Sequence, residues 1–253
     1  MSTEGFMDFT LGTGDDEVGK RSGRFQAKDS TTYRATFVWF SLPKVEDDKI
    51  VGWDDDGAFL EDGTLHPDAQ VRFTGCERIY KKGVGYILYG GPAYAKFGKP
   101  RQAVATVICL WPTNDEGELQ VEKFKSGKGW AVMPWIFSPD KYKDIKAKHK
   151  RFSLIKHDLS LACPENGAEF QKLSFTPEGE NLLQKLMASE KTEYKAVVAK
   201  ILGDAKAVAA GIYDELARNL TIDEIMEKLG ETPGTPTGSH SAKDVDALLD
   251  DVL

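Results

Sequence analysis

Basic and aromatic residues alternate over short distances in the middle third of the sequence, and this pattern holds most of its chemical information. Residues 69–160 contain 17 of the 33 Lys and Arg residues and 13 of the 26 aromatic residues. Single-stranded nucleic acid needs both kinds of side chain, because phosphates bind cations and unpaired bases stack on rings, at about 1–3 kcal/mol per base. The pattern therefore predicts a surface that binds single strands.

The candidate contacts form two groups, ten cations for phosphates and five rings for base stacking. The cations are Lys81, Lys82, Lys96, Lys99, Arg101, Lys125, Lys128, Lys148, Lys150 and Arg151, and the rings are Tyr80, Tyr86, Tyr94, Phe97 and Trp130. Glycines between them, such as Gly83 and Gly127, would let the backbone approach a strand closely. Core packing is the alternative role for any one of these rings.

The charge distribution supports this interpretation. Residues 1–68 carry 7 basic and 15 acidic side chains, residues 69–160 carry 17 and 8, and residues 161–253 carry 9 and 17. A basic centre inside a chain of net charge -7 is typical of a polyanion-binding protein with acidic appendages.

Motifs for catalysis or metal binding are weak. Gly14 to Lys20 has the spacing of a phosphate loop, but Arg21 follows where Ser or Thr is needed. A calcium loop around Trp53 to Gly57 would place glycines where acids are required. His157 beside Asp158 is a candidate acid/base pair, although neighbours in a strand usually point to opposite faces. The sequence therefore predicts no enzyme, no cofactor and no metal.

The elements that position the candidate surface are mainly strands. An irregular arm is expected over residues 1–32, a strand over 33–40 and an acidic loop over 43–69. Further β-type segments are expected at about 70–80, 84–90, 101–111, 118–124, 129–137, 151–162 and 169–175. Ser138 and Pro139 predict the start of a short basic helix within this series.

Helical periodicity replaces the strand pattern after Pro177. Two or three helices are expected over 178–229, packed on a core of residues 33–177, followed by a flexible linker at 230–241. The predicted fold class is mainly β, an OB-like barrel with an inserted helix and a C-terminal helical segment, α+β overall.

The last segment, residues 242–253, combines leucines at helical spacing with acidic residues. This acidic amphipathic tail is predicted to bind a protein partner. Its candidate contacts are Asp244, Asp246, Leu248, Leu249, Asp250, Asp251 and Leu253.

These features together resemble the single-stranded-DNA-binding proteins of tailed bacteriophages. The resemblance rests on the basic and aromatic region, on the stretches 151–163 and 169–177, and on the tail at 244–253. It implies an OB-type fold that coats and protects DNA in replication, recombination and repair, and a tail that recruits replisome partners. Some members hold a structural zinc through closely spaced Cys and His, a spacing that this chain lacks.

Two other functions stay open. One is a metal-dependent nuclease that uses the acidic loop at 46–62. The other is a phage transcription accessory protein whose basic region binds RNA.

The sequence also predicts a compartment. It contains no membrane-spanning run, its N-terminus is acidic, and its cysteines are three isolated residues, Cys76, Cys109 and Cys163. A cytoplasmic protein is expected, in the bacterial host if the chain is phage-encoded.

Overall fold

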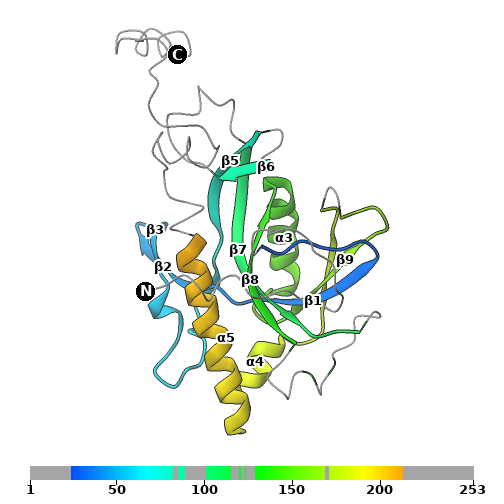
Figure 1. The fold of residues 1–253 in the computed structure, drawn as a ribbon. Coiled ribbons are helices and arrows are strands. Elements are labelled where there is room, and N and C mark those ends of the chain that lie inside the picture. The colour runs from blue at the N-terminus through cyan, green and yellow to red at the C-terminus, as the bar shows by residue number, and fades with distance from the viewer. Residues whose placement is uncertain are drawn as a thin grey trace, which may run out of the picture.

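The described part of the chain is mainly β, with two antiparallel sheets and a few helices in an α+β arrangement (Figure 1). The computed structural model describes residues 24–81, 85–88, 101–114, 120, 123, 129–168 and 171–212, with the backbone alone for 76–81 and 85–88. This confirms the coarse fold class that the sequence predicts.

The larger sheet contains seven strands. Their order is β10-β9-β1-β7-β5-β6, and β8 pairs with β7 off this path. The strands are β1 (Thr31–Phe37), β5 (Thr74–Lys81), β6 (Gly85–Leu88), β7 (Arg101–Trp111), β8 (Ala131–Phe137), β9 (Asp158–Cys163) and β10 (Ser174–Glu178). Among the described strands this sheet is open, so the OB-like barrel is not confirmed.

Strand β7 is the spine of the larger sheet. Its first half pairs with β5, from Arg101 opposite Arg78 to Ala105 opposite Thr74, and its last residues pair with β1. Strand β8 pairs along one edge of β7. Strands β5 and β1 therefore both pair with the opposite edge of β7, one after the other. The sequence explains this role, because residues 103–111 are an almost continuous apolar run and are buried nearly throughout.

The smaller sheet has the order β3-β2-β4, with β2 (Phe40–Glu46), β3 (Lys49–Asp54) and β4 (Gln70–Val71). Most of β2 and β3 lies where the sequence predicts an acidic loop, so that prediction is wrong for residues 43–54. Asp47 and Asp48 adopt positive φ angles of 48° and 61° and form a tight turn, which Asp tolerates better than most residues. The turn allows Val45 and Ile50 to stand opposite each other in a hairpin.

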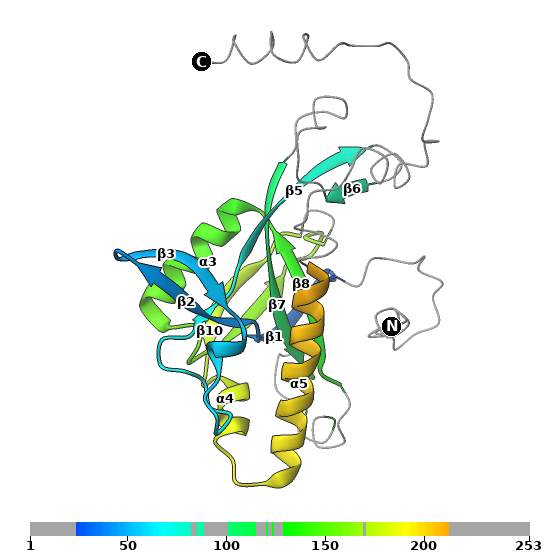
Figure 2. The same ribbon diagram turned by 90° about the vertical axis from the view of Figure 1, so that its left-hand side faces the viewer.

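Helices flank the larger sheet. In Figure 2, α3 (Pro139–Phe152) and α5 (Thr192–Gly211) lie on either side of β7 and β8. A short helix, α4 (Leu182–Met187), precedes α5, and a 3-10 turn, η2 (Asp56–Ala58), follows β3. No helix among the described residues is long and apolar enough to cross a membrane.

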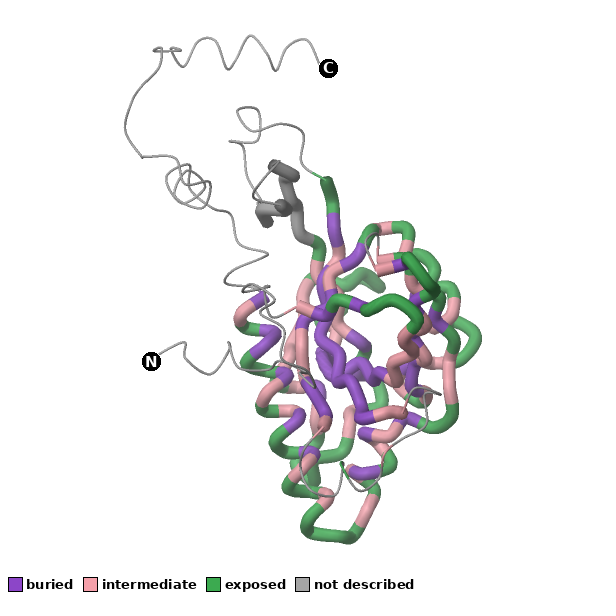
Figure 3. The backbone as a smooth tube through the Cα atoms, turned by 45° about the vertical axis from the view of Figure 1, so that its right-hand side comes forward, coloured by how far each residue is buried: buried purple, intermediate pink, exposed green. Residues whose placement is uncertain are grey.

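One hydrophobic core joins these elements. Phe37, Trp135 and Ile201 are each at most 2% exposed and belong to the same cluster of buried side chains. Figure 3 shows buried residues gathered along the central strands, with exposed residues on the outer turns. Phe25 also packs here, with its ring 6.0 Å from that of Trp135, so the described end of the predicted arm lies in the core.

Candidate nucleic-acid interface

Helix α3 presents a row of cations because its apolar residues fix which side faces the protein. It begins as the sequence predicts, with the backbone N–H of Lys141 donating to the Ser138 hydroxyl at 3.3 Å and Pro139 in the first turn. Ile145 is 1% exposed, and the ring of Tyr142 lies 5.1 Å from that of Phe73. The remaining long side chains of the helix are therefore directed away from this contact.

The first half of α3 has its cations engaged. Lys143 forms an ion pair with Asp140 at 3.1 Å between Nζ and Oδ1. The Lys141 ammonium donates to the Gln171 carbonyl at 2.8 Å, and burial lowers the pKa of this lysine. Lys141 therefore connects α3 to the chain at Gln171, and the charge of Lys143 is balanced by an acid on the same helix.

The second half of α3 carries exposed cations that no acidic side chain of the described structure neutralises. Lys146, Lys150 and Arg151 are exposed, and within the described part of the chain none of them forms an ion pair. Lys148 is half-buried, with its ammonium 5.1 Å from the centre of the Phe175 ring. Of the predicted phosphate contacts on this helix, Lys150 and Arg151 are thus exposed and without an ion pair, whereas Lys148 also contacts a ring of the protein.

Cations at this position also stabilise the helix. The C-terminal end of a helix has a partial negative charge of about half a unit, and a nearby cation there contributes typically 0.3–1 kcal/mol. Lys150 and Arg151 lie in the last turn, and their two full charges exceed this partial charge several-fold. The end of α3 therefore presents net positive charge to solvent.

A second group of predicted contacts lies at the far end of the larger sheet. The backbone of β5 and β6 places Tyr80 opposite Tyr86 and Lys81 opposite Gly85, and Arg101 begins β7 opposite Arg78. Figures 1 and 2 both show this end above the start of α3. Basic and aromatic residues distant in sequence are thus brought to one end of the sheet. Arg101 is exposed.

Trp130 does not have the exposure that stacking requires. It is only 8% exposed, and the ammonium of Lys200 on α5 lies 5.3 Å from its ring centre. Gly129 turns the chain into this position at φ 90°, where a Cβ would meet Pro112. The assignment of Trp130 to base stacking is therefore corrected to a packing role beneath α5.

The other predicted contacts cannot be placed. Of the DNA-binding candidates, Lys82, Tyr94, Lys96, Phe97, Lys99, Lys125 and Lys128 lie outside the described residues. The whole acidic tail, residues 242–253, also lies outside them. The end of α3 and the far end of the larger sheet are therefore the two places where the described residues include predicted contacts.

The acidic residues at the end of β3 and directly after it make separate contacts. Asp55 accepts hydrogen bonds from Trp39 Nε1 at 3.2 Å and from the Ser41 hydroxyl. Asp54 accepts one from the Gly57 backbone. Asp56 pairs with Lys206 at 2.7 Å, and this lysine lowers the pKa of the carboxyl. Among the described residues, no group of three or more His, Cys, Asp or Glu could hold a metal ion.

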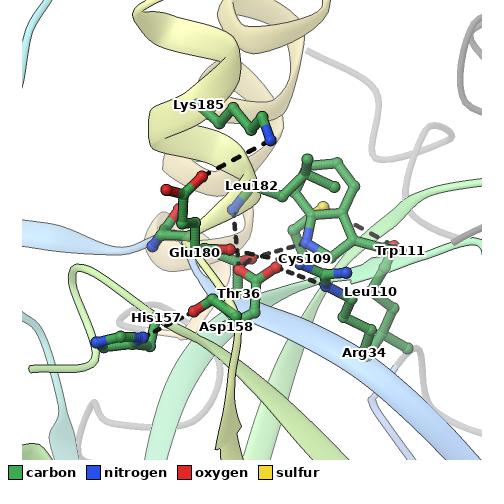
Figure 4. Close-up of polar contacts among 12 residues, drawn as sticks. Arg34, Thr36, Cys109, Leu110, Trp111, His157, Asp158, Glu180, Leu182 and Lys185 are labelled. Carbon is green, nitrogen blue, oxygen red and sulfur yellow. Dashed lines mark hydrogen bonds and ion pairs between the residues drawn. The ribbon is translucent and has the colours of Figure 1, made fainter. Parts of the chain in front are cut away.

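A buried polar cluster that the sequence did not reveal surrounds Asp158 (Figure 4). Its carboxylate is fully buried and accepts hydrogen bonds from Arg34 Nε at 2.8 Å, from the Thr36 hydroxyl and from the Leu182 backbone at 3.1 Å. Trp111 Nε1 donates to the same Thr36 oxygen at 2.7 Å. Burial raises the pKa of Asp158 despite these donors.

This cluster is structural rather than a catalytic pair. His157 is directed elsewhere, with Nδ1 2.7 Å from the Gly179 carbonyl oxygen. Asp158 instead connects β9 to β1 and to the first residue of α4. The sequence contains Arg34 and Asp158 more than a hundred positions apart, and no motif in it indicates that the two side chains form an ion pair.

Neither a scan of known protein families nor a search of curated proteins finds a match to this sequence.

Proposed function

We propose that the protein binds single-stranded DNA without strong sequence preference, coating and protecting it during phage DNA replication and recombination. The acidic tail would recruit replisome proteins to the coated strand. The protein would act without chemistry or nucleotide fuel, because binding only unpaired strands shifts melted duplex toward the open form by mass action.

The observation that supports the proposal most strongly is the cationic second half of α3. Lys146, Lys150 and Arg151 remain exposed and unpaired within the described part of an acidic protein. Such charges repel one another, and a phosphate backbone would relieve this repulsion while releasing counterions. The register of Tyr80, Tyr86 and Arg101 at the end of the sheet supports a second contact region for the same strand.

An OB-like barrel is part of the proposal. OB-folds are partly open five-stranded barrels that bind oligonucleotides on a strand face and its loops. The feature in its favour is β7, which pairs on one edge with β5 and then with β1. Successive pairing of this kind staggers the strands along β7, and a staggered register is one of the features of a closed barrel.

A salt titration of oligo-dT binding tests the proposal. The logarithm of the affinity should fall linearly with the logarithm of salt concentration, with a slope of about -0.7 per phosphate neutralised. The double variant Lys150→Ala, Arg151→Ala should weaken binding. It should also make the slope shallower by about 0.7 to 1.4, which corresponds to the loss of one to two phosphate contacts.

A matched double variant serves as the control. Lys44 and Lys49 are likewise exposed, form no ion pair in the described structure and lie in the β2–β3 hairpin, beside Asp47 and Asp48. Their replacement by alanine should leave both affinity and slope unchanged. A salt-independent titration, or equal effects of the two double variants, would contradict the proposal.

A second experiment tests the nuclease alternative. A labelled single strand incubated with the protein and magnesium or manganese should stay intact, and cleavage would favour the nuclease.

A further inference from the structure

Phe152, the last residue of α3, is an aromatic side chain exposed to solvent. It is 46% exposed, and no other aromatic side chain in the described part of the chain belongs to the exposed class. It stands seven residues after buried Ile145 and four after Lys148, so it continues the inward stripe of the helix beyond the point where the core covers it. Its ring is therefore apolar surface that the described fold leaves uncovered.

Several of the residues near Phe152 in the sequence are cations. Lys150 and Arg151 precede it directly, Lys148 lies one turn back, and exposed Lys156 follows within four residues. A single exposed apolar residue is common on protein surfaces and has no meaning by itself. An exposed ring beside unpaired cations is different, since it offers a flat apolar face where a polyanion is attracted.

The local backbone fixes the position of Phe152. Ser153 follows at φ 44°, and its N–H donates to the His149 carbonyl at 3.0 Å. The N–H of Leu154 donates to Nδ1 of the same histidine at 3.0 Å. Leu154 itself is 1% exposed and anchors the chain after the turn. Because this backbone is already fixed, little backbone freedom is lost when a ligand stacks on the ring.

We propose that Phe152 is a base-stacking residue for single-stranded nucleic acid, with Lys150 and Arg151 binding the adjoining phosphates. This inference rests on the proposed function and assigns to the end of α3 the stacking role that buried Trp130 does not fill. Phe152 is one of the 13 aromatic residues in the basic and aromatic region, but it is not among the five rings that the sequence predicts for stacking. A base is favoured over an apolar protein surface because Lys150 and Arg151, which directly precede Phe152, are exposed and form no ion pair in the described structure.

Substitution of Phe152 separates stacking from electrostatics. Phe152→Ala should weaken oligo-dT binding by about 5- to 150-fold, the range for one stacked base, and leave the salt slope unchanged. Phe152→Leu keeps apolar area without a ring and should be nearly as weak, whereas Phe152→Tyr should bind like the wild type. Circular dichroism serves as the folding control, and little change is expected because the side chain is exposed.

A spectroscopic variant tests contact with a base directly. In Phe152→Trp, oligo-dT should quench fluorescence beyond the quenching seen in the wild type, and an abasic oligomer of equal length should not. The inference is overturned if Phe152→Ala or Phe152→Leu binds like the wild type, or if the abasic oligomer quenches equally, while wild-type binding keeps its salt dependence. If the wild type fails to bind oligo-dT at all, the proposed function fails together with it.

Discussion

Asp158 shows how a single buried charge can organise several elements. Its carboxylate accepts hydrogen bonds from side chains of β1 and from the first backbone N–H of α4. Arg34, its ionic partner, keeps only 19% of its side chain exposed, so both charges are largely removed from water. Burial opposes ionisation strongly enough to raise the pKa of Asp158 even beside an arginine. The main role of the pair is therefore to fix how β1, β9 and α4 are placed relative to one another, and its net contribution to the free energy of unfolding is small.

Removing this carboxylate should be costly. Asp158→Ala would leave the Arg34 guanidinium, the Thr36 hydroxyl and the Leu182 N–H without their acceptor, which should lower the free energy of unfolding by about 3–5 kcal/mol. Asp158→Asn keeps an acceptor oxygen and should cost less. Urea unfolding measures both. Equal losses for the two variants would contradict the account, and oligo-dT affinity of the folded protein should not change in either.

The elements that form locally were accessible from the sequence. Strand β7 and helix α3 follow from an apolar run and from the Ser138-Pro139 start, and the structure places both within a few residues of the expected positions. The β2–β3 hairpin was missed because Asp47 and Asp48 suggest a loop by composition, whereas their role is to make a two-residue turn. Exposure was less accessible still. Trp130 and Phe152 both lie close to basic residues in the sequence, yet the first is buried and the second is exposed. Trp130 is covered because α5 packs over it, and Phe152 is exposed because it is the last residue of α3.

The end of helix α3 should respond to pH through His149. Its Nδ1 accepts the Leu154 N–H, so this nitrogen must be unprotonated, and burial lowers the pKa of the imidazole below 6.5. A base with a lowered pKa in the folded state contributes stability above its unfolded pKa and loses it as the pH falls through the folded one. The wild type should therefore lose stability on acidification below about pH 6.5.

His149→Gln provides the comparison. Glutamine has an oxygen that can accept from Leu154 and does not titrate in this range. The midpoint of urea unfolding, measured for both proteins at a neutral and at a mildly acidic pH, should fall more in the wild type than in the variant. Parallel losses in the two proteins would assign the acid sensitivity to other groups.

On the scale of the whole molecule, the two sheets and helix α5 share one core. The cluster of buried residues contains Phe25 before β1, Phe40 of β2, Ile108 of β7 and Ile201 of α5. The ion pair between Lys206 on α5 and Asp56 in η2 is a further connection, although exposed pairs of this kind contribute little. A continuous core predicts that these parts unfold together, and that the surface bearing α3 is held on a single rigid body.

Truncation of Ile201 tests this cooperativity. Ile201 is fully buried, so Ile201→Ala should lower the free energy of unfolding by about 2–5 kcal/mol and the melting temperature by roughly 5–20 °C. Far-UV circular dichroism reports the helices, and fluorescence reports tryptophans such as Trp39 and Trp135 in and beside the sheets. Both signals should shift by the same amount, because the cavity lies in a core that all elements share. Lys195→Ala, at an exposed position of the same helix, should change neither signal. Loss of the helical signal at a lower temperature than the fluorescence change would instead identify α5 as a separate unit.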